Sequence, residues 1–440
     1  MAKTNDLIEL TDMFIMDKEY KGNLVYVRDI DAMLVYQREK HYYKVYNKDE
    51  FEQVTYPFLR TRAKNLTQTM IREFFFHVKM SVNRKIENIS FDYVAFNDKF
   101  LNLNTFEFEE FNDEKMATHF LPFNSEDINM PTPIFNRFVD DVIVDSEMKP
   151  DTKLQMVLQE MFGFYFYNEF KPHIVFFLVG GGANGKSVIL KILSEIIGKD
   201  FINNKSIQTL TTKEFATSSF AGKKINICNE EESKYLRGDR FKAFISGDPV
   251  EGEHKFGGYY NFLPSTKFIF AMNDWPSFDG INFGLKRRLK IFPFLRKLAE
   301  HEQDKDLFEK MRCEIPGIIR FAIEGAKRLR AQKHIFSDSE AIDRSMIDFE
   351  NSISGAIMFI RENFIEDSGH FVSNNELYAE YVEWSSANGR KALNSANFLK
   401  DISNILKLPS ELQWIAEKKK TLRGRLLKRI DDNPPSNPPI

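Results

Sequence analysis

A glycine-rich run near the middle of the chain has the residues and spacing of a phosphate-binding loop. The run and the residue after it are Gly180, Gly181, Gly182, Ala183, Asn184, Gly185, Lys186, Ser187 and Val188. It matches the pattern G-x-x-x-x-G-K-[ST] at every specified position. Glycines let backbone N–H groups converge on phosphate oxygens, and the N-terminus of a following helix adds its dipole. We therefore expect ATP and Mg²⁺ as cofactors, with Lys186 neutralising the β- and γ-phosphates and the Ser187 hydroxyl ligating Mg²⁺.

Two glutamates lie where a nucleotide hydrolase needs an acidic group. The apolar segment Lys224 to Cys228, a predicted strand, runs into Asn229, Glu230 and Glu231. A carboxylate at this strand end can hold Mg²⁺ through water and polarise the attacking water. Glu230 is the first carboxylate after the strand, and it is the predicted catalytic acid and metal ligand. Glu231 is the alternative, and a solvated acidic loop is the other interpretation of the pair.

Polar residues also end two further apolar segments. The predicted strand KFIFAM runs into Asn273, whose amide can hydrogen-bond the γ-phosphate and the attacking water, although an ordinary turn explains this residue equally well by itself. The basic triplet Lys286, Arg287 and Arg288 precedes another apolar run. An arginine supplied by a neighbouring subunit can stabilise the transition-state charge of a phosphoryl group. The sequence does not separate Arg287 from Arg288 for this role, and a solvated basic turn is the simpler alternative.

The elements that must position these residues are those of a parallel α/β sheet. Ile174 to Val179 is an uninterrupted apolar run, typical of a strand buried on both faces. Val188 to Ile197 carries apolar residues at helical spacing, and further helices are predicted over Ile134 to Val144, Thr152 to Asn168 and Ile315 to Ala331. The strand–loop–helix context supports the phosphate-binding interpretation of the glycine-rich run.

The last part of the chain has the pattern of a DNA-binding domain. Helices are predicted over Asn374 to Ser385 and Ser395 to Leu408, the second with a polar face suited to a recognition helix. A run of cations around Gly424 follows, as in a basic wing that lies on phosphates. The residues assigned to DNA contacts are Lys400, Asn404 and Lys407 on the helix and Lys418, Lys419, Lys420, Arg423 and Arg425 in the basic run. A solvated basic face on a packing domain is the alternative.

Composition narrows the class of protein. The chain has 440 residues, of which 42% are hydrophobic and 28% charged, ordinary values for a globular protein of two or three domains. No apolar run reaches membrane-spanning length, so we expect no membrane partner. The two cysteines, Cys228 and Cys313, can form neither a zinc cluster nor a disulfide framework, which favours a cytoplasmic location. Since the formal charge is only −3, nucleic acid must be bound by local basic patches.

The order of the segments GGGANGKS, INICNEE, KFIFAMND and LKRRLKIFPF resembles that of the superfamily 3 helicases, especially the phage, plasmid and poxvirus-type primase-helicase group. In that group a DNA-contacting β-hairpin falls where His254 and Lys255 lie. The resemblance implies a hexameric ring that moves 3′-to-5′ on single strands, with Glu230 as the Walker B acid, Asn273 as the sensor and Arg288 or Arg287 as the arginine finger. Many relatives have Trp-Arg-Arg at the basic triplet and a second acid at position 229, which is Asn here.

The fold that the resemblance implies is α/β, an AAA+-type P-loop ATPase core with flanking regions. We expect an N-terminal α+β region over 1–120, a helical region over 121–170, the core over 171–335, a C-terminal winged-helix domain over 346–430 and a disordered tail over 431–440. No primase domain is expected, because no strand carries an Asp-x-Asp pair with a downstream carboxylate and histidine.

The function expected from these observations is that of an ATP-dependent, ring-forming replicative DNA helicase of a phage, plasmid or similar mobile element. Its expected partners are single-stranded and forked DNA, an origin duplex, other copies of the chain in a homo-hexamer, and a separate primase or polymerase. Two alternatives remain at this stage. One is a DNA-binding AAA+ initiator that uses ATP without unwinding, and the other is a P-loop ATPase that acts on proteins.

Overall fold

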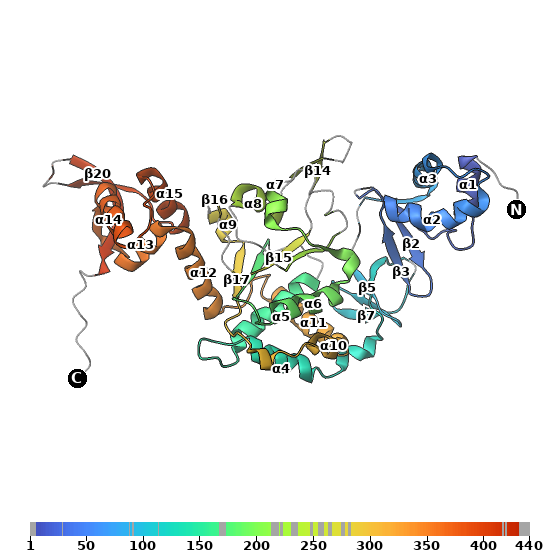
Figure 1. The fold of residues 1–440 in the computed structure, drawn as a ribbon, viewed down its shortest axis with the longest axis horizontal. Helices are drawn as coiled ribbons and strands as arrows, with labels where there is room; N and C mark the ends of the chain where they lie inside the picture. The colour runs from blue at the N-terminus through green and yellow to red at the C-terminus, as the bar shows by residue number, and fades with distance from the viewer. Residues whose placement is uncertain are drawn as a thin grey trace.

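The molecule is elongated, with its N-terminal and C-terminal units at opposite ends of a larger central unit (Figure 1). This computed structural model describes residues 6–28, 30–87, 89, 92–112, 114–166, 173–212, 220, 223–229, 236–246, 250–253, 259–262, 266–273, 278–279, 283–415, 418 and 420–430. Within these residues no helix combines the length and the apolar character needed to cross a membrane.

The central unit is built on a five-stranded sheet in which every pairing is parallel. Its strands are β9 (Val175–Val179), β10 (Ile202–Asn203), β11 (Ile225–Cys228), β15 (Lys267–Met272) and β17 (Leu289–Pro293). They are arranged in the order β10-β11-β15-β9-β17, so the first strand in the chain lies between the last two. The three strands predicted from apolar runs are confirmed as β9, β11 and β15. The carboxyl end of β9 therefore lies where the strand order reverses, the usual place for a ligand in a parallel sheet.

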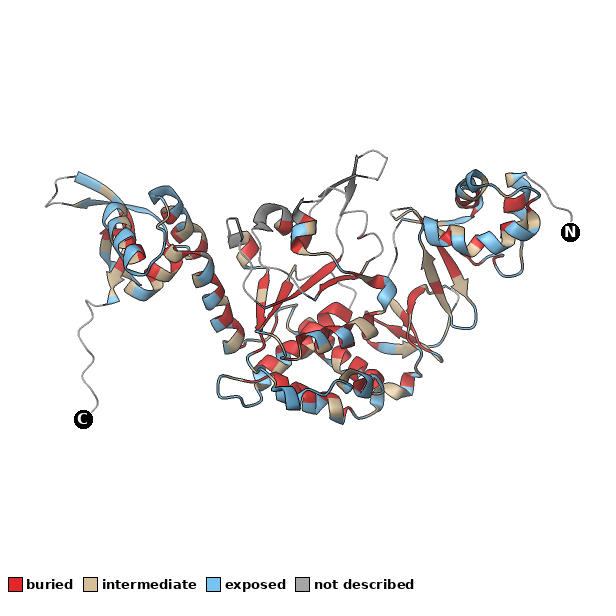
Figure 2. Ribbon diagram, viewed as in Figure 1, coloured by how far each residue is buried: buried red, intermediate tan, exposed pale blue. Residues whose placement is uncertain are grey.

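Helices cover both faces of this sheet, so its strands are almost entirely buried (Figure 2). One face packs against α4 (Pro133–Val142), α5 (Thr152–Phe166), α6 (Lys186–Ile197), α10 (Leu307–Arg312) and α11 (Ile315–Ala331). The other packs against α7 (Ile207–Thr212), α8 (Gly238–Ser246), α9 (Phe283–Lys286) and the end of α12 (Glu340–Ile353). Along β9, Phe176 and Leu178 face the first set while Val175 and Phe177 face the second. The helices predicted before and after the glycine-rich run are confirmed as α4, α5, α6 and α11.

The carboxyl end of α5 is bonded directly to the sheet. Lys267 and Lys224, at the start of β15 and just before β11, donate hydrogen bonds to the carbonyl oxygens of Phe164 and Phe166. Cations are favourable at this end of a helix because the last carbonyls carry partial negative charge. Burial lowers the pKa of Lys224 to about 7.

The helices α5 and α11 approach each other so closely that glycine is required in both. A Cβ atom at Gly325 would lie 1.9 Å from the carbonyl oxygen of Gln159, and one at Gly163 would lie 2.2 Å from the backbone nitrogen of Ala326. Both obstacles are backbone atoms, so no change of side-chain rotamer can relieve the overlap. The two helices would have to move apart.

We predict that Gly325→Ala lowers the unfolding midpoint of the protein, with a loss of about 1–3 kcal/mol expected for overpacking. Thermal and denaturant unfolding measure the change. The matched control is Gly355→Ala, at the first position of α13 (Gly355–Asn363), because a Cβ there meets its nearest neighbour at 3.6 Å. Equal midpoints for the two variants would contradict the close approach.

The N-terminal part contains two four-stranded sheets. The first has the order β3-β2-β1-β4 and the second β7-β6-β5-β8. The elements are α1 (Leu7–Ile15), β1 (Leu24–Val27), β2 (Ala32–Gln37), β3 (Tyr42–Tyr46), α2 (Lys48–Arg62), α3 (Gln68–Ser81), β4 (Arg84–Ile86), β5 (Tyr93–Ala95), β6 (Phe100–Asn102), β7 (Glu107–Glu109) and β8 (Ala117–Phe120). Val94 and Leu101 of the second sheet belong to the same hydrophobic cluster as α5 and α11. The second sheet therefore packs with the central unit, whereas α1, α2 and α3 surround a core of their own with part of the first sheet.

The C-terminal unit is a small α/β domain reached through α12. After α13, its elements are β18 (Phe364–Ser373), α14 (Asn374–Ala387), α15 (Ser395–Ile405), β19 (Glu411–Ile415) and β20 (Lys420–Arg429). The strands form an antiparallel sheet in the order β18-β20-β19. The stretch between the predicted core and the predicted winged-helix domain, 336–345, already contains the first turns of α12. The buried side chains of Ile342 and Phe349, seven positions apart, explain why that segment is helical.

Short elements complete the central unit. They are η1 (Ser125–Asn129), η2 (Lys199–Phe201), η4 (Glu300–Glu302), the parallel pair β12 (Leu236–Arg237) and β16 (Phe278–Asp279), and the antiparallel pair β13 (Val250–Glu253) and β14 (Tyr259–Phe262). Glu253 pairs with Tyr259, so the strands needed for the predicted hairpin are present on either side of residues 254–258. His254 and Lys255, the residues predicted to contact DNA there, lie outside the described residues.

Candidate functional site

The glycine-rich run joins the carboxyl end of β9 to the first residue of α6. Three of its residues have positive φ, namely Gly182 at +87°, Ala183 at +47° and Gly185 at +89°, which a loop that turns back sharply into a helix requires. A Cβ at Gly180 would lie 2.5 Å from the carbonyl oxygen of Phe294, so this position also needs glycine. At Gly181 and Gly182, in contrast, an added Cβ meets no atom within 4 Å. The outer side of the loop is therefore open to a ligand.

Lys186 is a buried cation, and its hydrogen-bond acceptors among the described residues are all neutral. Its Nζ donates to the carbonyl oxygen of Gly180, to Oδ1 of Asn184 at 3.1 Å and to Oδ1 of Asn273 at 3.5 Å. The residue is only 6% exposed, and burial lowers the pKa of its ammonium group. A phosphate beside this group would supply the missing negative charge and would favour the charged form again.

Parallel pairing of β15 with β9 explains why Asn273 reaches Lys186. Met272 and Val179, the last residues of the two strands, are partners in the register. The backbone N–H of Gly180 also donates to the carbonyl oxygen of Met272 at 3.3 Å. Asn273 and the glycine-rich loop therefore leave the sheet side by side, and the predicted association of this amide with the phosphate-binding residues agrees with the geometry.

The predicted acidic residues Glu230 and Glu231 lie outside the described residues. The chain is described up to Asn229, which is exposed and directly follows β11. β11 is the neighbour of β15 on the side away from β9, and Cys228 pairs with Phe270. The strand that carries the glutamates thus ends at the same edge of the sheet as Asn273 and Lys186, while the assignment of Glu230 as catalytic acid stays a prediction.

The residues of the loop fit a nucleoside triphosphate. Gly181 and Gly182 leave room for phosphate oxygens, Lys186 supplies a desolvated positive charge, and α6 presents the N–H groups of its first turn. Nδ2 of Asn184 is buried without a hydrogen-bond partner in the described part of the structure, and a ligand at the loop is one way to satisfy it. Ser187, the predicted Mg²⁺ ligand, is exposed beside Lys186, and Val188 is half-buried.

The three side chains of the basic triplet lie in different environments. Lys286 forms an ion pair of 2.5 Å with Glu350, which is 2% exposed and also pairs with Arg361 of the C-terminal unit. Arg288 is half-buried and donates to the carbonyl oxygen of Gly284 at 2.5 Å. Arg287 is exposed. Of the two arginines predicted as a finger, Arg287 therefore has the more exposed side chain.

Sequence reasoning missed Glu350. This buried carboxylate at the end of α12 joins α9 of the central unit to α13, and Lys286 also donates to the carbonyl oxygen of Ile405 at 3.3 Å. A signal was present, because Glu350 directly follows Phe349 within the apolar pattern of α12. A buried acid is rare unless it is paired.

The second helix predicted in the C-terminal unit is present as α15, but it ends earlier than expected. Its role in DNA recognition stays a prediction. Phe398 and Ile402 belong to the core of the C-terminal unit, and Ile405 is also buried. Lys400 is exposed and Asn404 is half-buried. Lys407 lies beyond the end of the helix with φ of +56°, so the prediction that it shares a helical face with Lys400 is wrong.

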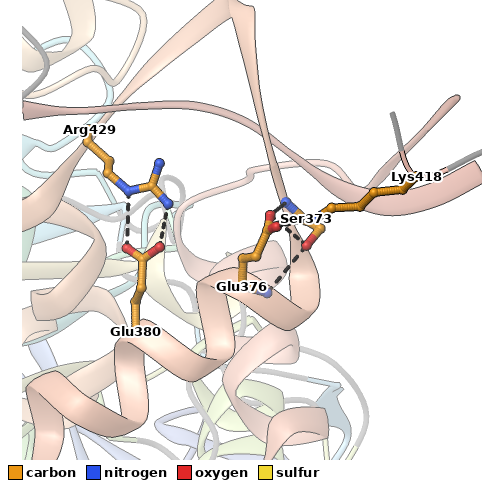
Figure 3. A network of polar contacts seen from close by, with 5 residues as sticks. All are labelled: Ser373, Glu376, Glu380, Lys418 and Arg429. Carbon is orange, nitrogen blue, oxygen red and sulfur yellow. Dashed lines mark hydrogen bonds and ion pairs between the residues drawn. The ribbon is translucent and has the colours of Figure 1, made fainter. Parts of the chain in front are cut away.

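The basic run does not form one continuous charged face (Figure 3). Lys418 pairs with Glu376 at 2.6 Å, and Arg429 pairs with Glu380. The pairing with Lys418 is the main reason why the pKa of Glu376 falls to about 2. Lys420 and Arg423 are exposed, and Lys419 lies outside the described residues.

The prediction that Arg425 contacts DNA is wrong. Its side chain is 2% exposed and donates to the Ser403 hydroxyl of α15 at 2.8 Å. Arg425 lies opposite Val372 of β18, on the same face of β20 as the core residue Leu427, whereas Arg423 lies in the exposed part of β20 that pairs with Leu412 of β19. This guanidinium holds the sheet to α15, and it is not available to phosphates.

Two parts of the chain match known sequence families. Residues 178–288 match a family of unknown function (DUF5906), and residues 356–433 match a family described as "Poxvirus D5 protein-like". The first match extends from the end of β9 to Arg288, and the second covers the C-terminal unit from α13 onward. The two matched regions therefore coincide with the candidate nucleotide site and with the unit that carries the basic run.

The chain is also similar to parts of two longer viral proteins. It is 25% identical over 238 residues to the "Putative helicase L207/L206" of Acanthamoeba polyphaga mimivirus, covering 48% of this chain and 24% of that protein. It is 22% identical over 341 residues to the "Putative primase C962R" of African swine fever virus, covering 71% of this chain and 34% of that protein. Among solved structures, the apo A form of the NrS-1 C-terminal region aligns with 97% of this chain and 100% of that chain, at a TM-score of 0.47 and 14% identity.

We predict that Lys186→Ala reduces ATP hydrolysis by about 100-fold or more, because a charge that faces developing negative charge in a desolvated site is lost. The measurement is steady-state phosphate release together with equilibrium binding of a fluorescent ATP analogue. Lys191→Ala is the matched control, since Lys191 lies on the same helix but is exposed. A similar loss in both variants would show that the phosphate-binding role of Lys186 is mistaken.

Proposed function

We propose that this chain is an ATP-dependent, ring-forming DNA helicase with an AAA+-type core of the superfamily 3 kind. The observation that carries the proposal is the contact between Lys186 and Asn273 at the carboxyl edge of the parallel sheet. A motor protein that converts ATP hydrolysis into movement needs a phosphate-binding loop and a polar residue on the adjacent strand that senses the γ-phosphate. The position of β9 between β15 and β17 supports the AAA+-type core.

In this proposal each residue of the ATP site has a defined role. Lys186 and the N-terminus of α6 bind the phosphates of ATP, and Ser187 with Glu230 holds Mg²⁺. Bound Mg²⁺ would neutralise charge on the transferred phosphoryl group. Glu230 polarises the attacking water, and Asn273 reports the presence of the γ-phosphate to β15. Arg287, exposed at the end of α9, completes the site of a neighbouring subunit.

The relatives support a role in DNA replication. One is named as a helicase and another as a primase, and both come from viruses. The C-terminal unit matches the "Poxvirus D5 protein-like" family. Its element order, α13-β18-α14-α15-β19-β20 with the sheet order β18-β20-β19, supports a winged helix in which β19 and β20 are the wing. Exposed Lys400, Lys420 and Arg423 are the DNA contacts that we retain.

The direct test is strand displacement from a forked DNA substrate. We expect the chain to separate the strands only with ATP and Mg²⁺, and we expect Glu230→Gln to bind ATP without hydrolysing it or unwinding DNA. Glu231→Gln is the matched control. DNA-stimulated ATPase activity without strand displacement would favour the initiator function, and normal hydrolysis by Glu230→Gln alongside an inactive Glu231→Gln would reassign the catalytic acid.

A second test concerns the shared site. We expect Arg287→Ala and Lys186→Ala to be inactive separately, and we expect a mixture of the two to recover part of the ATPase activity. Some interfaces in mixed rings would pair an intact phosphate-binding loop with an intact arginine. Arg288→Ala is tested in parallel, and its bond to Gly284 predicts an effect on folding stability that mixing does not restore. Failure of the Arg287→Ala mixture to recover activity, in rings shown to exchange subunits, would contradict the shared site.

A further inference from the structure

The hairpin of β19 and β20 exposes two large apolar side chains next to each other. Leu412 is 65% exposed and Trp414 is 61% exposed. They are two positions apart on β19, so they lie on the same face of the strand. β19 is also the edge strand of the sheet β18-β20-β19. The hairpin projects from the end of the molecule, and its described residues are mostly exposed (Figure 2).

The neighbouring residues on β20 show what kind of surface this is. Leu412 is the cross-strand partner of Arg423, and Trp414 is the partner of Thr421. Directly opposite residues of an antiparallel pair share a face, so that face carries Leu412, Trp414, Thr421 and Arg423. Both Thr421 and Arg423 are exposed. The face therefore combines a flat aromatic ring and an aliphatic side chain with a hydroxyl and a guanidinium.

The charge on this face is available to an external anion. Two other cations of the run are already paired with acids of α14, Lys418 with Glu376 and Arg429 with Glu380 (Figure 3), whereas Lys420 and Arg423 are exposed. Across the described residues, no carboxylate forms an ion pair with Arg423. The guanidinium thus lies beside exposed apolar surface without a counter-charge of its own within that part of the chain.

An unpaired nucleotide carries both a flat apolar group and a negative charge. Bases of single-stranded DNA stack on exposed aromatic side chains while cations bind the adjoining phosphates. A base within a duplex is already stacked on its neighbours, so its face is covered. We infer that Leu412, Trp414 and Arg423 form a stacking site for an unpaired base of single-stranded DNA. The inference rests on the proposed DNA-binding function and names the part of the substrate that the wing recognises.

The site would place a base-binding surface on a wing, an element that would otherwise contact only phosphates. In a strand-separating protein, an aromatic side chain that stacks on an unpaired base favours separated strands over the duplex at the fork. Arg423 would hold the phosphate that adjoins the stacked base, because guanidinium binds phosphate oxygens in a bidentate manner.

The test measures binding of two probes to the 440-residue chain, namely an oligothymidylate and an oligonucleotide of the same length that consists of abasic sites. Both carry the same phosphates, but only the first carries bases. We expect Trp414→Ala to weaken binding of the oligothymidylate by about 5- to 100-fold and to leave binding of the abasic probe unchanged. Trp414→Phe should retain most of the affinity, because it keeps an aromatic face. Arg423→Ala should weaken both probes and reduce the salt dependence of binding by about 0.7 in the log–log slope.

The matched control is Val382→Ala on α14, an apolar side chain that is 39% exposed and does not belong to the hairpin. It should bind both probes as the unchanged chain does. Equal losses of the two probes in Trp414→Ala, or no loss of either, would overturn the stacking site. A change in self-association without a change in affinity for the oligothymidylate would also overturn it, and would assign the face to a second copy of the chain.

These outcomes are distinguishable from failure of the proposed function. If the unchanged chain unwinds forked DNA and binds both probes equally, the stacking site alone is wrong. If the unchanged chain binds neither probe and displaces no strand, the DNA-binding function itself is wrong.

Discussion

The parallel pairing of β9 with β15 on one side and β17 on the other is the constraint on which the rest of the central unit depends. Because all three strands point the same way, the loop after β9 and Asn273 after β15 leave the sheet at one edge. Parallel strands need long crossover connections, and here these supply α6 on one face of the sheet and α7, α8 and α9 on the other. A sheet buried in this way excludes water beneath the loop, so the ammonium group of Lys186 is desolvated before any ligand arrives.

Desolvation of Lys186 destabilises the charged form of its side chain when no ligand is bound. In the described part of the chain, three neutral oxygens hold the ammonium in place without cancelling its charge. Charged hydrogen-bond partners would stabilise the free protein more, but they would then compete with phosphate. A buried cation with neutral acceptors keeps its electrostatic interaction for the ligand, and the interaction is stronger there than in water.

A second buried charge, on Glu350, connects the amino end of β17 to the C-terminal unit. Lys286 and Arg361 approach the same carboxylate from different units, and Lys286 also binds the last turn of α15 through Ile405. Buried ion pairs contribute little net stability, but loss of one partner is costly because an uncompensated charge remains. The junction therefore determines where α9 and the end of α15 lie relative to each other more than it stabilises the fold. Arg287 directly follows Lys286, so the exposed arginine and the C-terminal unit share this anchor.

Local patterns in the sequence determined the strands β9, β11 and β15, the helices from α4 to α6 and α11, and the presence of a phosphate-binding loop. Each depends on a few consecutive residues with a clear period or a fixed spacing, so no distant contact was needed to predict it. The contact between Lys186 and Asn273, and the different environments of Arg287 and Arg288, depend on strand order and on packing between distant segments. The basic run shows the same limit. Its cations are close together in the sequence, but Arg425 is buried against α15, and acids of α14 neutralise Lys418 and Arg429. Charge can be counted along a chain, whereas its availability to a ligand depends on which side chains the folded structure brings beside it.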